Sequence, residues 1–260
     1  MTKHIHESLR FKPSGIVTPN RTVLAAMTNK QSHDDGRLSS NELQWLKRRA
    51  EGGFGIVTTA AAHVSKNGQS WKGELGVFDD IHIDGLSRLA RDIHKEKSLL
   101  IAQLFHGGLQ ADENLTGSRP ISASRTKSRL SKSGFSKQAS EKEIIRVISD
   151  FKDAAHRCHE AGFDGVEIHG AHGYLITQFL GIKTNLRSDS WGGSLNNRSR
   201  LLIEILRTMR DELPENFIVG VRISPEIKTM GIRLDDSIEL AKKISNMEID
   251  FIHISCWDVF

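Results

Sequence analysis

Short, almost wholly apolar runs alternate with longer amphipathic segments along the chain. The apolar runs are too continuous for half-exposed strands, and they predict strands buried on both faces at 20–27, 54–64, 99–108, 164–170, 217–224 and 250–260. The amphipathic segments predict helices at 39–53, 83–97, 140–160, 196–213 and 235–247. Ser39 with Glu42, and Ser140 with Glu143, have the spacing of a capping box, which indicates where two of these helices begin.

Helices between consecutive strands indicate a parallel sheet, which leaves an open doubly wound sheet or a (β/α)8 barrel of the TIM type. No GxGxxG motif follows the first strand, and this weakens the doubly wound, dinucleotide-binding alternative. Polar residues stand at the C-terminal ends of several strands, where barrels build their sites: Thr28, Gln103, His106, His169, His172 and Arg222. We therefore expect a single α/β barrel domain over residues 1–260.

Composition narrows the class of protein. Of the 260 residues, 38% are apolar and 26% charged, and no apolar run approaches the roughly 20 residues of a membrane span, so we expect a soluble protein without membrane contact. The N-terminal residues lack the apolar core of a secretory signal, which makes the cytoplasm the expected location. The two cysteines, Cys158 and Cys256, lack the spacing of a cluster or thiolate zinc site.

Basic residues are densest at 119–137, and the net charge is +4. That stretch is rich in serine and has one aromatic residue, Phe135, so a solvated loop is favoured over an RNA-binding arm. We expect no nucleic-acid partner.

Residues 169–174 read HGAHGY directly after the apolar strand DGVEI. Glycine and alanine between the two histidines permit a tight turn and a close approach of backbone or ligand. With Glu167 nearby, His169 and His172 could serve as ligands of a metal ion, and Tyr174 could be a packing residue. Residue types alone leave these alternatives open.

The stretch HGAHGYLITQFLGIKTNLRSDSWGGSLNNRSR at 169–200 closely resembles the Old Yellow Enzyme family of FMN-dependent ene-reductases and NADH:flavin oxidoreductases. The resemblance extends to NRTVLAAMT at 20–28, IAQLFHGG at 101–108 and GVRIS at 220–224. It covers essentially the whole chain and is weakest at 109–139. It implies FMN as cofactor, NAD(P)H as reductant and a small α,β-unsaturated carbonyl or similar compound as substrate, with no metal.

The resemblance also implies residue roles. Gln103 matches the amide that hydrogen-bonds the flavin pyrimidine edge, and Arg222 matches the arginine beside flavin N1 and O2, where it would stabilise the anionic reduced flavin. Thr28 falls near flavin O4. Ala26 and Ala61 match positions that contact the isoalloxazine through their backbone.

The histidines and the tyrosine acquire roles in the same way. His169 and His172 resemble the pair that binds the carbonyl or phenolate oxygen of the substrate, where negative charge grows during hydride addition. Tyr174 resembles the proton donor to the neighbouring carbon. These three are the expected catalytic residues.

The end of the chain departs from the family pattern. Phe260 falls within or just after the sixth strand, so the eight-stranded barrel is expected to be truncated there, without the later loops that grip the cofactor phosphate. Open sheet edges favour association, and a homo-oligomer is expected. Two alternatives remain beside the ene-reductase: a non-catalytic barrel remnant that binds a partner chain, and a metal-dependent barrel hydrolase that uses His169 and His172.

Overall fold

Six parallel strands form one curved sheet whose spatial order follows the order in the chain. The computed structural model describes residues 4–256. The sheet consists of β3 (Val23–Leu24), β4 (Ile56–His63), β5 (Leu99–Phe105), β8 (Gly165–Gly170), β9 (Ile218–Ile223) and β10 (Phe251–Ile254). In a doubly wound sheet the strand order reverses at one point. Here the strand order never reverses, so each strand extends the sheet in one direction, as in a barrel. The expectation of a barrel-type α/β fold is confirmed.

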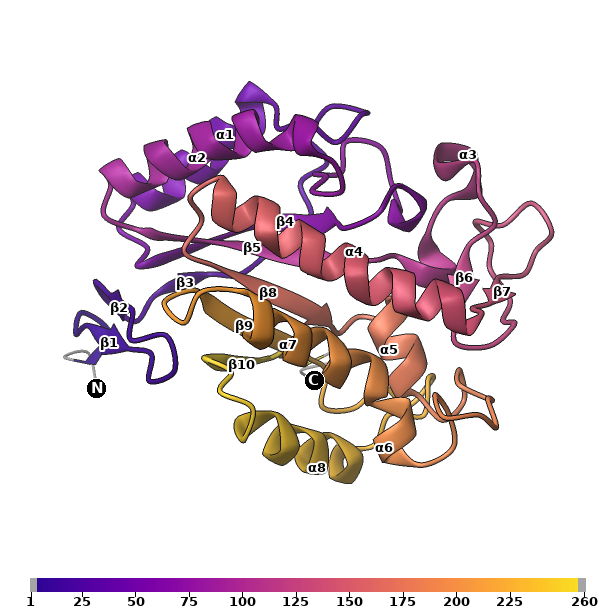
Figure 1. Ribbon diagram of the computed structural model, residues 1–260. Helices are drawn as coiled ribbons and strands as arrows, with labels where there is room; N and C mark the ends of the chain where they lie inside the picture. Colours follow the sequence, from indigo (N-terminus) through magenta and orange to yellow (C-terminus); the bar gives the residue numbers. More distant parts are fainter. Residues whose placement is uncertain (1–3, 257–260) are drawn as a thin grey trace.

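Five long helices cover the outside of the curved sheet (Figure 1). They are α1 (Ser40–Glu51), α2 (Ile83–Lys95), α4 (Glu141–Glu160), α7 (Arg200–Glu212) and α8 (Leu234–Ser245). Their apolar faces and the outer side chains of the strands form one continuous buried cluster that runs from Leu24 to Ile249. Such a continuous core supports the prediction of a single domain. The expected truncation of the barrel after the sixth strand also stays a prediction.

The capping boxes have different outcomes. At α4, Ser140 and Glu143 form both reciprocal hydrogen bonds, as predicted. At α1, Ser39 accepts the N–H of Glu42, but the Glu42 carboxylate turns away and binds Asn29 and Ser32 in the loop after β3. Because Glu42 is fully buried, its carboxylate anchors this loop instead of completing the box.

The predicted boundaries shift at several elements. The sixth strand, expected over 250–260, is paired only over β10, and its positions 257–260 lie outside the described residues. The first strand, expected over 20–27, is reduced to the two residues of β3, since only Val23 and Leu24 pair with β4. The helix expected over 196–213 is interrupted at Ser199, which separates α6 (Leu195–Arg198) from α7. Sequence patterns locate elements better than their ends, which depend on tertiary pairing.

Small elements occupy the two ends of the sheet (Figure 1). The hairpin of β1 (Leu9–Arg10) and β2 (Val17–Thr18) lies at the N-terminal ends of the strands, where Phe11 packs in a second apolar cluster with Ile56, Ile101 and Ile218. The C-terminal ends, here called the mouth of the sheet, carry α3 (Glu113–Thr116), β6 (Ile121–Ser122), β7 (Lys137–Gln138), α5 (Leu175–Leu180) and α6. The hairpin thus closes one end and loops surround the other.

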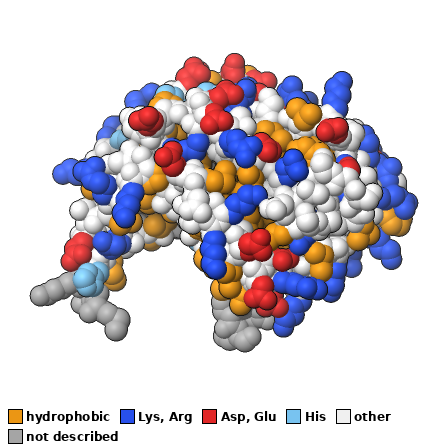
Figure 2. All heavy atoms as spheres, turned by 60° about the horizontal axis from the view of Figure 1, so that its bottom comes forward, with side chains coloured by type: hydrophobic (Ala, Val, Ile, Leu, Met, Phe, Trp, Pro, Cys, Tyr) orange, Lys and Arg blue, Asp and Glu red, His pale blue; other side chains and the backbone are white. Residues whose placement is uncertain are grey.

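The basic stretch 119–137 is folded against itself. Arg119 donates to the backbone carbonyls of Phe135 and Ser136, and the guanidinium of Arg125 lies 3.9 Å from the centre of the Phe135 ring. On the face shown in Figure 2, Lys and Arg side chains alternate with Asp and Glu. Neither feature favours a nucleic-acid interface.

Within residues 4–256, no helix is both long and apolar enough to cross a membrane.

Candidate active site

The end of β8 delivers two histidines and a tyrosine to the mouth. The strand ends at Gly170, and the backbone then turns through two left-handed residues, His172 (φ 59°) and Gly173 (φ 80°), before α5 begins after Tyr174. A left-handed conformation is unfavourable for a side chain such as that of His172 and persists where the surroundings enforce it. Gly173 suits the left-handed part of this turn, and Gly170 allows the close approach of the Arg222 carbonyl, where a Cβ would lie 3.0 Å from the oxygen.

Two glutamines hold the turn in place. Buried Gln178 donates to the carbonyls of Gly107 and Gly173 and accepts the N–H of Leu109, so it joins the turn to the loop after β5. Gln110 donates a second hydrogen bond to the Gly173 carbonyl at 2.9 Å. These bonds satisfy backbone groups that a turn leaves open, and they fix the direction of the side chains that follow.

The three predicted catalytic side chains lie together. Ring centroids are 4.9 Å apart for His169 and His172, and 5.0 Å apart for His169 and Tyr174, with near-perpendicular planes in both pairs. Phe105 packs edge-on against Tyr174 at 4.9 Å, and Trp71 lies at 6.4 Å. The Tyr174 hydroxyl makes no hydrogen bond to the described residues. The cluster therefore has apolar walls and an available phenol.

Burial keeps all three side chains neutral. Desolvation, reinforced by the charges of His172 and Arg222, holds the pKa of His169 well below its ordinary value. Desolvation and then the Arg222 charge lower the pKa of His172 to about 4. Desolvation, with the negative charge of Glu74, raises the pKa of Tyr174 to about 12. At neutral pH the cluster offers N–H and O–H groups and no fixed charge.

Hydrogen bonds decide where the imidazole protons lie. His169 Nδ1 accepts the N–H of Ala171 at 3.3 Å, which leaves the proton of this neutral ring on Nε2. His172 Nε2 lies 2.6 Å from Ser255 Oγ, and Arg222 donates to the same oxygen at 3.1 Å. Because arginine only donates, the Ser255 hydroxyl hydrogen remains available for His172 Nε2. Ser255 therefore links the His172 ring to the Arg222 guanidinium.

The residues expected to hold a flavin are mostly neighbours. Ala61 of β4 pairs in register with Gln103 of β5, and Arg222 of β9 reaches across the mouth to the Ala26 carbonyl at 3.4 Å. Thr28 is exposed and makes no hydrogen bond to the described residues. Four of the five predicted positions are thus brought together in two pairs, and Thr28 makes no described contact with them.

Three further polar residues belong to this mouth. Glu167 accepts a hydrogen bond from the Gln103 amide nitrogen at 2.6 Å and lies 2.8 Å from His253 Nδ1, while Ser255 touches His172 and Arg222. Sequence reasoning missed His253 and Ser255. Their signal was the alternation in FIHIS, which places both on the same face of an otherwise apolar strand.

The donors and acceptors present fit a flavin ring. Arg222 Nε is buried without a hydrogen-bond partner among the described residues, and Gln103 Oε1 accepts no hydrogen bond from them. An unpaired cationic donor and an unpaired amide oxygen suit the N1–C2–O2 and N3–H edge of an isoalloxazine. In contrast, no group of three or more metal-ligating side chains occurs within residues 4–256.

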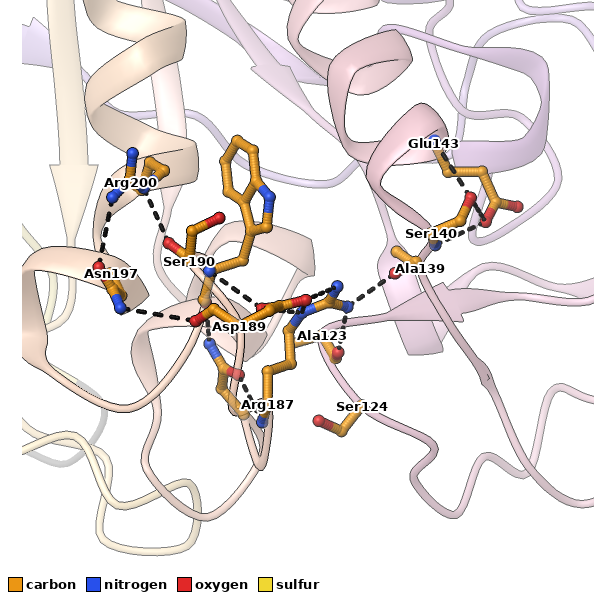
Figure 3. A network of polar contacts seen from close by, with 12 residues as sticks. Ala123, Ser124, Ala139, Ser140, Glu143, Arg187, Asp189, Ser190, Asn197 and Arg200 are labelled. Atoms are coloured by element: carbon orange, nitrogen blue, oxygen red, sulfur yellow. Dashed lines mark hydrogen bonds and ion pairs between the residues drawn. The ribbon is translucent and has the colours of Figure 1, made fainter.

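A buried arginine holds the surrounding loops together (Figure 3). Arg187 donates to both carboxylate oxygens of Asp189 and to the backbone carbonyls of Ala123 and Ala139. Arg200 donates to the Ser190 carbonyl on the other side of this loop. The NLRSD motif at 185–189 therefore joins the loop after α5 to the segment before α4. Its role is to support the loops around the site.

Comparison with known proteins agrees with this geometry. Residues 9–259 match the family described as NADH:flavin oxidoreductase / NADH oxidase. The probable NADH-dependent flavin oxidoreductase YqiG of Bacillus subtilis is 35% identical over 262 aligned positions, which cover 99% of this chain and 70% of that protein. The NADH:fumarate oxidoreductase of Klebsiella pneumoniae is 34% identical over 94% of this chain, which spans only 27% of that relative.

Solved structures lead to the same group. A 2-naphthoyl-CoA reductase in complex with 2-naphthoyl-CoA superposes with a TM-score of 0.91 at 28% identity, covering 98% of this chain and 41% of that one. An Old Yellow Enzyme homologue from Zymomonas mobilis gives 0.88 at 27% identity, covering 97% and 73%. The expected class, an FMN oxidoreductase that uses NADH or NADPH, is confirmed at the level of the family. This chain belongs to the NADH:flavin oxidoreductase / NADH oxidase family.

Proposed function

We propose that the chain acts as an ene-reductase, which reduces C=C bonds activated by a neighbouring carbonyl group. The observation that carries the proposal is the neutral cluster of His169, His172 and Tyr174 beside Gln103 and Arg222. FMN, reduced by NADH or NADPH, would supply the hydride. The side chains of the site would then bind the flavin, bind the substrate oxygen and donate a proton.

Gln103 and Arg222 would hold the flavin. The unpaired Oε1 of Gln103 would accept from a ring N–H, and the unpaired Nε of Arg222 would donate to a ring carbonyl or nitrogen. Burial lowers the pKa of Arg222 while the Glu167 charge raises it, and a guanidinium keeps its proton throughout. Its permanent charge favours an anionic ring. Ala26, Thr28 and Ala61 would complete the cofactor site.

His169 and His172 would bind the substrate carbonyl oxygen. Each neutral ring carries one N–H, which in His169 is on Nε2 because Nδ1 accepts the N–H of Ala171. Two such donors polarise the carbonyl and stabilise the negative charge that develops on its oxygen. The surrounding rings of Phe105 and Trp71 exclude water, which strengthens these hydrogen bonds.

Tyr174 would donate the proton to the carbon next to the carbonyl. Its hydroxyl has no partner among the described residues, and a pKa of about 12 keeps the proton on the phenol at neutral pH. Phe105 and His169 fix the direction of the ring from two sides. The proton therefore leaves from a positioned neutral acid.

The first test is the visible absorption spectrum of the folded chain after incubation with excess FMN and desalting. Retained flavin absorbance that NAD(P)H bleaches without oxygen is the expected result. A folded protein that retains no flavin would refute the proposal. In that case tight binding of a partner chain would favour a non-catalytic role, and a stoichiometric metal ion would favour a hydrolase.

Two variants test the residue roles in the loaded protein. Tyr174→Phe should slow alkene reduction about a hundredfold or more and leave flavin reduction by nicotinamide unchanged. Equal losses in both half-reactions would contradict the proton-donor role. His169→Ala should weaken binding of phenols, which mimic the oxyanion, by about tenfold or more. Unchanged phenol affinity would rule out the oxygen-binding role.

A further inference from the structure

A buried carboxylate connects the predicted flavin amide to the last described strand. Glu167 on β8 is 2% exposed, and its two oxygens have different partners. Oε1 accepts the side-chain N–H of Gln103 from β5 at 2.6 Å, and Oε2 lies 2.8 Å from Nδ1 of His253 on β10. A chain of three side chains therefore crosses the sheet.

The strand register explains why these side chains meet. Gln103 pairs with Glu167 across β5 and β8, so both side chains point to the same face at the same level. His253 lies one strand beyond β9, at the level of Arg222. The intervening residue at the level of Glu167 is Gly220, and the ring of Phe251 from β10 lies over it, so β9 places no side chain between Glu167 and β10.

Chemistry fixes the direction of the Gln103 amide. A side-chain amide can turn by 180° and exchange its oxygen and nitrogen, and in many sites either orientation makes hydrogen bonds. An ionised carboxylate only accepts hydrogen bonds, so next to Glu167 the amide must present its nitrogen. Its carbonyl oxygen is then directed away from Glu167, toward the opening.

His253 fixes the carboxylate in turn. With Nδ1 protonated it donates to Glu167 Oε2, which leaves Oε1 for Gln103. Arg222, one strand nearer, adds a positive charge that offsets the negative charge of Glu167. Both Glu167 and His253 also line a cavity of about 280 Å³ on the inner face of the sheet, so the imidazole has access to solvent.

We propose that Glu167 and His253 are positioning residues for the cofactor: Glu167 determines which atom of the Gln103 amide faces the flavin, and His253 holds Glu167. The inference rests on the proposed flavin site. Gln103 accordingly presents its carbonyl oxygen to the N3–H of the pyrimidine edge. Neither Glu167 nor His253 touches the cofactor in this arrangement.

A double-mutant cycle on FMN affinity tests the proposal. The dissociation constant is measured by quenching of FMN fluorescence on folded apoprotein, in the full chain. Glu167→Gln should weaken FMN about fivefold, because its amide no longer dictates the orientation of Gln103. In a Gln103→Ala background the same substitution should change affinity less than twofold, since there is no amide left to orient.

His253 supplies a second pair of variants at a less buried position. His253→Leu removes the donor and should reproduce the loss seen in Glu167→Gln, again only when Gln103 is present. His253→Asn retains an N–H near the place of Nδ1 and should restore affinity to near wild type. Asp150→Asn neutralises a buried carboxylate on α4 that pairs with Arg146 of the same helix and makes no hydrogen bond to a predicted flavin residue, so it should leave the affinity unchanged.

The outcomes separate this inference from the proposed function. If wild type binds FMN but Glu167→Gln and His253→Leu have equal effects with and without Gln103, or no effect, the positioning role is overturned and the flavin site stands. If folded wild type does not bind FMN, the proposed function is refuted and the positioning role is refuted with it.

Discussion

Acid should destabilise the fold through His106, a buried histidine whose ring is neutral in the folded state. His106 follows β5, is 2% exposed, accepts the N–H of Gly108 at Nδ1 and has no partner for its buried Nε2 among the described residues. Desolvation, with a smaller contribution from the charge of His63, lowers the pKa of His106 to about 3. The ring therefore stays neutral in the folded state under conditions that protonate it in the unfolded chain.

The sign and size follow from proton linkage. The unfolded chain binds a proton at this site below its ordinary pKa of 6.5, and the folded state binds it only near 3. The contribution of His106 is therefore complete above pH 6.5 and is lost as the pH falls toward 3. Between pH 7.5 and 5.0 this one site should remove about 2 kcal/mol from the free energy of unfolding.

Urea unfolding followed by tryptophan fluorescence at the two pH values measures this loss. In His106→Asn, whose amide oxygen can still accept the Gly108 N–H, the loss between pH 7.5 and 5.0 should be about 2 kcal/mol smaller than in wild type. His94 is a control of opposite sign: its hydrogen bond to Asp164 raises its pKa, so His94→Asn should make the acid loss larger. An unchanged acid loss in His106→Asn would refute the reasoning.

Three further predictions concern the site and its support. Tyr174 is the only tyrosine in the chain, so absorbance at the phenolate band reports it alone; we expect an apparent pKa near 12, and a value near 10 would contradict its burial. In Arg187→Lys the ammonium group cannot donate to two backbone carbonyls and a carboxylate together. The substitution should lower the free energy of unfolding in urea titrations by about 2–3 kcal/mol. A loss below about 0.5 kcal/mol would argue against the support role of Arg187. A Cβ on Gly165 would lie 2.4 Å from the Ile218 carbonyl oxygen in the next strand, so Gly165→Ala should lower the free energy of unfolding by about 1–3 kcal/mol. Gly85→Ala on α2, where a Cβ has no contact closer than 3.5 Å, should be neutral or stabilising. Equal melting temperatures of the two variants would contradict the close approach of the strands at Gly165.

Site residues that are close together in the sequence can be predicted from it more readily than residues that come from distant strands. His169, His172 and Tyr174 stand within six positions, and the single turn between β8 and α5 brings their rings together. His253 and Ser255 come from the last strand, about 80 residues later, and act only because β10 lies next to β9. The alternation in FIHIS places both on one face of the strand, but it does not show which groups of other strands they meet.

The small elements around the mouth show the same limit. β6 and β7 have two residues each and pair with each other across the loop 123–136, so no hydrophobic period of either predicts them. The hairpin of β1 and β2 at the other end has equally short strands. Elements of this length are stabilised by the tertiary contacts around them, and not by the propensity of their residues.

The sequence by itself determined the number and order of the main strands and helices and the barrel-type class of the fold. Continuous apolar runs can be satisfied only when both faces are buried, and capping residues act within one turn of helix. Tertiary structure decided which polar groups meet. The Gln103 amide faces Glu167, Arg222 reaches Ala26, the ring proton of His169 is placed by Ala171, and His172 meets Ser255. Hydrogen bonds between strands depend on register and curvature, which the hydrophobic pattern of a single strand does not encode.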